Sequence, residues 1–410
     1  MADEGTSPTA RWRAIAEEHT RRLIDDGRIA LHDVEGEEYF HRPGEVIVAI
    51  DRLEILSADL ADLGGAEPQI HEDVGSATVA LPVEHDLHAV VSDLRSKHQI
   101  GADALAPHHV MFGTPKRAGC PGRPAHPGPP VDLVQGEAGS GVLIALIDTG
   151  LAEEAIQIDW VNQQVTIGGG IDLEVLDADG DTFLDFEAGH GTFIAGVIAQ
   201  TAPGARVRAV RALDSDGVTD DLRAARAVLQ AVEEGAQIIN LSFGGYCFGD
   251  EGPLALQRVL ADQPGVVVAA AGNDGVDRPF FPAAHPGVIG VAALGATGRR
   301  APFSNFGDWV QACADGDRLL SIFVRGIERD ITRAGGQRTS FSDPFAYWSG
   351  TSFAAPQVAA ALAVRMWETG ESGQQAAQGL ILDGALSRRG GLGVRITTQV
   401  RSNPASVESP

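Results

Sequence analysis

Val142-Leu-Ile-Ala-Leu-Ile-Asp-Thr-Gly150 is the stretch that decides the fold. An unbroken apolar run leads into one carboxylate, which indicates a strand buried on both faces. Comparable runs follow at 207–213, 238–241, 266–271 and 288–293, with helical stretches near 189–200, 220–234 and 253–262 between them. Alternation of buried strands with helices predicts an α/β fold with a doubly wound, mostly parallel sheet.

The charge of the chain narrows its possible partners. The 410 residues include 56 acidic and 31 basic side chains, for a formal charge of −25. Such a surface repels phosphate groups and anionic lipid, so we expect neither nucleic acid nor membrane as a partner. Residues 1–30 hold no apolar run of signal-peptide length, and no run could span a bilayer. We therefore expect a cytoplasmic protein, although secretion by an unrecognised route or a mis-assigned start codon would change that.

Composition divides the chain into five segments. Residues 43–113 have the pattern strand, helix, strand, strand, helix, strand, which predicts a small N-terminal α+β domain of the ferredoxin-like kind, with an edge strand at 106–112. Proline and glycine are dense between 114 and 130, which predicts an exposed linker without helix or sheet. The segments are a polar, partly helical extension (1–42), the small domain (43–113), the linker (114–130), the α/β domain (131–395) and a disordered tail (396–410).

Four polar residues follow predicted strands or begin predicted helices. Asp148 ends the first buried run, and Asn273 follows the run at 266–271. His190 stands between two glycines ahead of a helix, and Ser352 lies near the N-terminus of a helix because Pro356 must fall in its first turn. Each residue has a plainer interpretation: a turn or cap for Asp148, Asn273 and Ser352, and a structural role for one of 12 histidines.

Taken in chain order, these motifs resemble those of the subtilisin-like serine peptidases, the subtilase family. The similarity extends to 238–245, 281–286 and 303–307. The resemblance implies a serine endopeptidase, a hydrolase that works through an acyl-enzyme. In it Asp148, His190 and Ser352 would form the catalytic triad, with the Asn273 side chain and the Ser352 N–H as the oxyanion hole.

The same resemblance implies an extended peptide or unfolded protein as the substrate, bound as an added β-strand. We expect the first specificity pocket to accept apolar side chains, and Lys or Arg through Asp274. The implied substrate-binding positions are Gly217, Val218 and Thr219 on one side, Ser242, Phe243 and Gly244 on the other, and Gly272, Asp274, Phe281 and Ala283 around the pocket.

The 43–113 domain resembles the family's propeptide, an intramolecular chaperone and inhibitor. Its closing strand at 108–114 would bring the linker into the cleft, and cleavage within 113–130 would release the mature enzyme from the zymogen. Two alternatives stay open. One is a peptide-binding or scaffold protein without turnover, and the other is a maturation protease dedicated to one cellular peptide.

No cofactor is required by these motifs, but calcium is a candidate. Asp177, Asp179 and Asp181 offer carboxylate oxygens in one loop, and many family members bind this ion. Thr182 stands where an EF-hand loop needs glycine, so that motif fails, and an acidic loop without a metal is the alternative. Cys247 and Cys313 are expected in the core.

Overall fold

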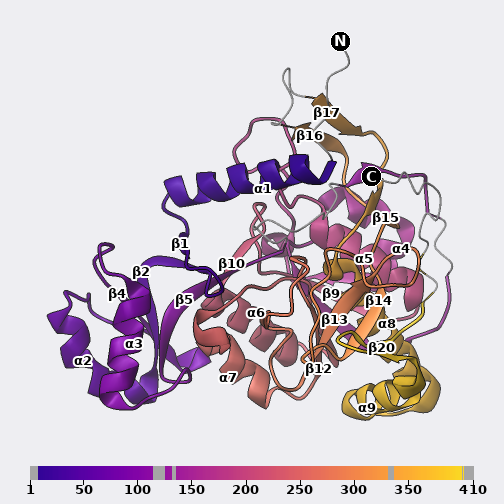
Figure 1. Ribbon diagram of the computed structural model, residues 1–410. Coiled ribbons are helices and arrows are strands. Elements are labelled where there is room, and N and C mark those ends of the chain that lie inside the picture. Colours follow the sequence, from indigo (N-terminus) through magenta and orange to yellow (C-terminus); the bar gives the residue numbers. More distant parts are fainter. Residues whose placement is uncertain (1–7, 114–124, 132–134, 331–336, 399, 401–410) are drawn as a thin grey trace.

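The computed structural model describes residues 8–113, 125–131, 135–330, 337–398 and 400 (Figure 1). A nine-stranded sheet forms its centre, in the order β19-β20-β14-β13-β12-β11-β7-β9-β8. All neighbours in it are parallel except β19 and β20. The strands are β7 (Leu143–Asp148), β8 (Val165–Ile167), β9 (Arg206–Arg211), β11 (Ile238–Leu241), β12 (Val266–Ala270), β13 (Val288–Leu294), β14 (Ala312–Asp315), β19 (Arg388–Arg389) and β20 (Gly393–Arg395). The predicted doubly wound sheet is confirmed.

Helices cover both faces of this sheet. Ile144 and Leu146 of β7 pack with α5 (His190–Thr201) and α8 (Thr351–Thr369) in one apolar core. Ala145 and Ile147 pack on the other face with α6 (Asp221–Glu233) and α7 (Leu254–Asp262). Because successive side chains of a strand point to opposite faces, an unbroken apolar run serves both cores.

Residues 39–112 form a second sheet with two helices. The elements are β2 (Tyr39–Ala49), α2 (Leu53–Asp62), β3 (Gln69–His71), β4 (Ser76–Ala80), α3 (Leu87–His98) and β5 (Leu105–Phe112). The strands are antiparallel in the order β5-β2-β4-β3, and β1 (Ala30–His32) pairs with β2. The observed order of strands and helices is the one expected from the sequence.

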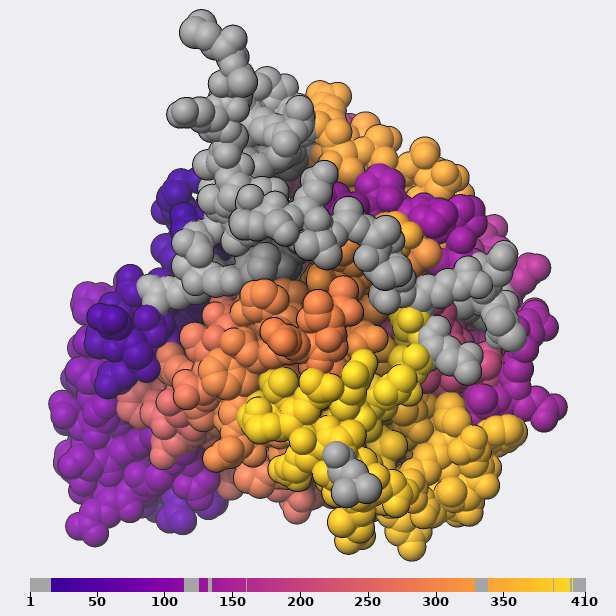
Figure 2. Space-filling model, turned by 45° about the vertical axis from the view of Figure 1, so that its right-hand side comes forward, coloured from indigo at the N-terminus to yellow at the C-terminus, as the bar shows by residue number. Residues whose placement is uncertain are grey.

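The expected edge strand is not an edge. On its free side β5 pairs antiparallel with β10 (Val218–Asp220), which belongs to the segment between β9 and α6. The two sheets are therefore joined by backbone hydrogen bonds, and α6 and α7 pack against the N-terminal elements. In the space-filling view, the indigo-to-purple N-terminal residues lie directly against the salmon-coloured segment that follows residue 220 (Figure 2).

The remaining elements are peripheral. They are α1 (Pro8–Asp25), α4 (Asp159–Gln164), α9 (Gly373–Asp383), the hairpin of β16 (Gly326–Asp330) and β17 (Gln337–Phe341), and a small sheet of β15 (Leu319–Ile322), β18 (Phe345–Trp348) and β6 (His126–Pro127). β6 lies in the predicted linker and pairs with β18, so the linker is not free of sheet structure as expected. Linker residues 114–124 and tail residues 401–410 lie outside the described residues, as do the side chains of Trp12 and Ile15.

Candidate active site

A buried carboxylate–imidazole pair lies at the carboxyl end of β7. Asp148 is the last residue of β7 and His190 the first of α5, and each is 1% exposed. The Nδ1 atom of His190 lies 2.7 Å from Oδ1 of Asp148, which also accepts the Thr149 N–H at 2.8 Å. This turn requires two glycines. A Cβ on Gly191 would lie 2.3 Å from the Gly150 carbonyl oxygen, and Gly189 has φ +85°, which glycine adopts readily.

The pair alters the protonation of the imidazole. Burial disfavours a charge on His190, but the charge and hydrogen bond of Asp148, aided by Glu187 and Glu174, raise its pKa to about 9. Nε2 of His190 is buried and has no hydrogen-bond partner among the described residues. The imidazole therefore has one nitrogen fixed and the other available to a reacting group.

The buried carboxylate of Glu174, which the sequence did not indicate as a site residue, supports both Asp148 and His190. Oε1 of Glu174 accepts the Thr149 hydroxyl at 2.5 Å and the Gly189 N–H at 2.8 Å, and Oε2 accepts the Thr192 hydroxyl at 2.9 Å. These donors flank Asp148 and His190 in the chain. Burial raises the pKa of Glu174 to about 7, against the opposing effect of these hydrogen bonds.

Ser352 and Asn273 meet at the N-terminus of α8. Ser352 is the second residue of that helix and is 3% exposed. Oδ1 of Asn273 accepts the N–H of Thr351 at 2.8 Å and its hydroxyl at 2.9 Å. These two bonds fix the orientation of the Asn273 side-chain amide, whose Nδ2 group is then a donor without a partner among the described residues. The ring centroid of Phe353, the residue after Ser352, lies 5.4 Å from that of His190, so the first turn of α8 packs against the imidazole.

The protein's own β5 strand runs into this site. Gly113, just past β5, donates its N–H to the Gly217 carbonyl at 3.0 Å, while Phe112 and Gly244 exchange two backbone hydrogen bonds of 2.9 Å. The Ser352 hydroxyl donates to the Gly113 carbonyl at 3.4 Å. A strand of the chain is thus held between β10 and Gly244, and its end reaches the predicted nucleophile.

Helix α1 packs against the end of this strand and lies above β10 in the view of Figure 1. Leu23 packs with Phe112 and Val218. Nε2 of His19 lies 2.9 Å from Asp216, which also pairs with Arg22 and Arg28. Although burial opposes its charge, His19 and the two arginines hold the pKa of Asp216 well below its usual range. The helix is therefore tied to the segment that precedes β10.

The sequence-predicted substrate positions have different surroundings in the structure. Val218 and Thr219 lie in β10, and Ser242 bonds the Ser352 carbonyl at 2.8 Å. Phe243 is 1% and Ala283 0% exposed, so both are core residues. The hydroxyl of Tyr246 donates to Asp274 at 2.9 Å. The Phe281 backbone pairs with Gly245.

The acidic loop before His190 has a different set of neighbours from the expected one. Oxygens of Asp177, Asp179 and Asp185 lie within 4.8 Å of one another, so Asp185 rather than Asp181 completes the cluster. The N–H of Asp181 instead donates to Asp177 at 3.0 Å and to Asp179 at 3.1 Å. Carboxylates in this arrangement suit calcium, but the loop's own amides already bond to them.

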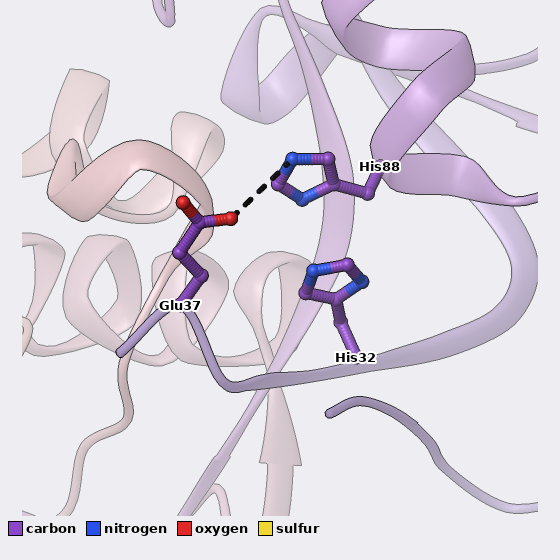
Figure 3. Close-up of side chains that lie close together, drawn as sticks. All are labelled: His32, Glu37 and His88. Atoms are coloured by element: carbon purple, nitrogen blue, oxygen red, sulfur yellow. Dashed lines mark ion pairs between the residues drawn. The ribbon is translucent and has the colours of Figure 1, made fainter. Parts of the chain in front are cut away.

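A second cluster, His32, Glu37 and His88, suits a metal less well (Figure 3). The two imidazoles are stacked with centroids 4.2 Å apart and planes 11° apart, and Nε2 of His88 lies 3.8 Å from Glu37. A metal ion lies in the plane of each imidazole that binds it, so parallel stacked rings do not direct two nitrogens at one ion. The stack continues onto Tyr39, and we interpret the cluster as packing.

Two described cysteines are buried and unpaired, as expected from the sequence. Cys247 and Cys313 are each 0% exposed. Burial raises the pKa of the Cys247 thiol well above its usual value and that of Cys313 to about 11. Both thiols are therefore protonated at neutral pH and unreactive. Among the described residues no helix is both long and apolar enough to cross a bilayer.

A buried Asp–His pair and a serine at a helix N-terminus, both at the edge of a parallel sheet, are features that serine hydrolases share. The comparisons with known proteins define the class further. The model of the Subtilase family, Peptidase_S8, matches residues 139–401. The chain belongs to the subtilase family, as the sequence predicted.

Individual relatives agree with this assignment. The chain is 36% identical over 238 residues to a thermophilic serine proteinase of Bacillus sp. (strain AK1), covering 56% of this chain and 52% of that protein. It is 32% identical over 231 residues to thermitase of Thermoactinomyces vulgaris, covering 54% of this chain and 73% of thermitase. The match therefore spans about half the length of the first relative.

A solved structure gives the same fold. The crystal structure of fervidolysin from Fervidobacterium pennivorans, described as a keratinolytic enzyme related to subtilisin, aligns with a TM-score of 0.61 at 21% identity. The alignment covers 90% of this chain and 61% of that chain. It therefore includes residues on both sides of the linker.

Proposed function

We propose that this protein is a serine endopeptidase in which Ser352 is the nucleophile, His190 the general base and Asp148 the residue that orients the imidazole. The observation that carries the proposal is the contact of the Ser352 hydroxyl with the carbonyl of Gly113, just past β5, in a chain that also holds the buried Asp148–His190 pair. A peptide held in this way presents its backbone to Ser352, and we propose that Nε2 of His190, which has no partner among the described residues, takes the serine proton.

The chemistry requires an alcohol to attack a peptide carbonyl. The Ser352 hydroxyl gives its proton to Nε2 of His190 as its oxygen bonds to the carbonyl carbon, and His190⁺ then protonates the leaving amine. A water molecule then gives its proton to Nε2 of His190 as its oxygen bonds to the acyl carbon, and His190⁺ protonates the Ser352 oxygen as the acid is released. Asp148 keeps the proton on Nδ1 and stabilises the imidazolium, through the 2.7 Å contact.

The negative oxygen formed during attack needs donors that are already in position. Asn273 supplies its Nδ2 group, because its oxygen is committed to Thr351. The backbone N–H of Ser352 lies in the first turn of α8, where N–H groups have no partner within the helix. The positive end of the helix dipole adds to this stabilisation.

The substrate is an extended peptide segment. The contacts of Gly113 and Phe112 with Gly217 and Gly244 are the antiparallel backbone bonds that an added strand makes. A folded helix or a paired strand cannot form them, so we propose unfolded chains or exposed loops as substrates. A cytoplasmic location and the absence of nucleic-acid or membrane partners stay predictions.

We further propose that the chain is a self-inhibited precursor. Residues 43–113 would act as a ferredoxin-like, propeptide-like domain whose β5 blocks the cleft, and cleavage within 113–130 would separate it from the peptidase domain at 131–395. Its attachment is polar as well as apolar. His108 of β5 lies 2.7 Å from Glu45 and 3.5 Å from Asp220, which raise its pKa to about 9 although burial opposes its charge.

Calcium has a place in this proposal as a stabilising ion only. The carboxylates of Asp177, Asp179 and Asp185 would hold the ion. The backbone N–H of Asp181 donates to Asp177 and Asp179. When bound, the ion would neutralise the acidic loop that leads to His190.

A binding module without turnover is the second candidate, because the Ser352 hydroxyl bonds to Gly113 in the closed form and His190 Nε2 has no partner among the described residues. One experiment separates the two functions. The intact mass of the purified chain and its hydrolysis of an unfolded protein are followed over time, with Ser352→Ala alongside. A peptidase shortens itself and digests the substrate only with Ser352. Unchanged mass and undigested substrate for both proteins would favour the binding module.

A further inference from the structure

We infer that Phe280 fills the pocket for the substrate side chain next to the cleaved bond and limits that residue to glycine, alanine or serine. The inference rests on the proposed peptidase function and adds its specificity. Phe280 is 5% exposed and follows the loop that begins at Asn273. The sequence assigned no role to it.

The direction of the bound strand locates the pocket. A Cβ on Gly113 would lie 3.0 Å from the Leu213 side chain and 3.3 Å from Glu187, on the His190 side of the strand. Successive side chains of an extended strand alternate in direction. The Ser352 hydroxyl donates a hydrogen bond to the Gly113 carbonyl oxygen, so we take the residue after Gly113 as the one before the cleaved bond. In a peptide bound like this strand, that residue directs its side chain to the side opposite that of Gly113. There it meets the wall formed by Gly244, which is bonded to Phe112, and Gly272, which precedes Asn273.

The Phe280 ring occupies the space between these two glycines. A Cβ added to Gly244 would lie 2.4 Å from Cε1 of Phe280, and one added to Gly272 would lie 3.0 Å from Cδ1 of the same ring. The ring thus touches both walls at once. The ring of Phe281 lies on another side, where a Cβ on Gly252 would approach it to 2.7 Å.

The ring is also held from behind. Tyr246 packs edge-on against Phe280 with centroids 5.3 Å apart. The Tyr246 hydroxyl donates to Asp274 at 2.9 Å and accepts from Nδ2 of Asn305 at 3.2 Å. The Arg278 guanidinium lies 4.7 Å from the Tyr246 ring centroid. A large substrate side chain would have to displace this whole group and not one mobile ring.

The same contacts change the role expected for Asp274. Its carboxylate accepts the Tyr246 hydroxyl behind the ring. The Asp274 carboxylate is therefore engaged by Tyr246, the residue whose ring packs against Phe280. The expected acceptance of Lys or Arg through Asp274 does not fit this arrangement, and we infer that basic residues are excluded together with large apolar ones.

The test is a set of peptide substrates that differ only in the residue before the cleaved bond. They are assayed with the full chain after incubation to constant mass, beside Phe280→Gly and the control Phe345→Gly in β18. Wild type should prefer alanine over phenylalanine about 100-fold in kcat/KM, since even small misfits in a closed pocket change this ratio 10- to 200-fold. Phe280→Gly should raise kcat/KM for the phenylalanine substrate about 100-fold. Phe345→Gly should keep the preference for alanine.

Wild type that cleaves after phenylalanine, leucine or lysine as well as after alanine would overturn the inference, even if the variant does not fold. An unchanged preference in a folded Phe280→Gly protein would do the same. Labelling of Ser352 by a small fluorophosphonate needs no specificity pocket. It therefore distinguishes a failure of the pocket inference from a failure of the proposed peptidase function. Labelling with cleavage after large residues rejects the pocket inference alone, whereas absent labelling rejects the proposed function and the inference with it.

Discussion

Replacement of Glu174 by glutamine should remove one defined contribution to the pH dependence of stability. Glu174 is buried behind the Asp148–His190 pair, and its pKa is raised from 4.5 to about 7. Between these values the folded protein binds a proton that the unfolded chain releases, so stability falls as the pH rises. One pKa unit corresponds to about 1.4 kcal/mol, so the fall between pH 4.5 and pH 7 is about 3 kcal/mol. Glutamine has no such proton.

The assay is urea unfolding at a series of pH values from 5 to 8. Every protein carries Ser352→Ala so that it does not digest itself. The difference in unfolding free energy between the Glu174→Gln protein and its parent should shift in favour of the variant by about 3 kcal/mol as the pH rises. Glu233→Gln on the exposed face of α6 is the control and should give a constant difference. A constant difference for Glu174→Gln as well would refute the reasoning.

Alanine at the same position separates charge from hydrogen bonding. It leaves the Gly189 N–H and the hydroxyls of Thr149 and Thr192 without their acceptor. A buried polar group without a partner costs about 1–3 kcal/mol, so Glu174→Ala should be destabilised more than Glu174→Gln at pH 5. Equal stability of the two variants at that pH would mean that these bonds contribute nothing.

Three further predictions concern the neighbouring groups. Asn273→Ala should lower kcat about 100-fold or more with little change in KM, the size known for loss of one such donor in subtilisin itself; peptide hydrolysis measures it, and an unchanged kcat would contradict the assigned role. The rate of fluorophosphonate labelling should rise as the pH rises toward 9, because only neutral His190 accepts a proton. The stabilisation of the fold by the charge of His190 is lost over the same pH range. A labelling rate that stays constant from pH 6 to 9 would contradict this prediction. Asp216→Asn should speed amide hydrogen exchange in α1, since His19 and two arginines lose their shared partner. Glu18→Gln on the exposed face of α1 should not change the exchange rate. Equal exchange rates in the two variants would show that Asp216 does not hold the helix.

The sequence predicted the framework of this molecule well. An apolar run such as 142–147 serves two cores at once, which is why a strand covered on both faces was predictable from it. Asp148, Asn273 and Ser352 were found because parallel strands and helix N-termini converge at one edge of a sheet. The family itself was predicted from the ordered motifs and is confirmed by the match over 139–401.

Contacts between distant segments could not be predicted. Glu174 has no local pattern, and its importance follows from three donors in separate segments that fold onto it. Phe280 became visible only once Gly244 and Gly272 were placed on either side of its ring. The family resemblance brought the strand at 108–114 to the cleft and placed residues 217–219 beside a bound strand, but no local pattern specified the residue-by-residue pairing of β5 with β10. The roles of the individual site residues stay predictions.

The central claim is that His190 makes the hydroxyl of Ser352 nucleophilic. Its most direct test is the position and rate of fluorophosphonate labelling, read by mass spectrometry of peptides from the full chain. We predict one adduct, on Ser352, whose rate of formation falls at least about 100-fold in His190→Ala. An adduct on another residue, or an equal rate without the imidazole, would contradict the account.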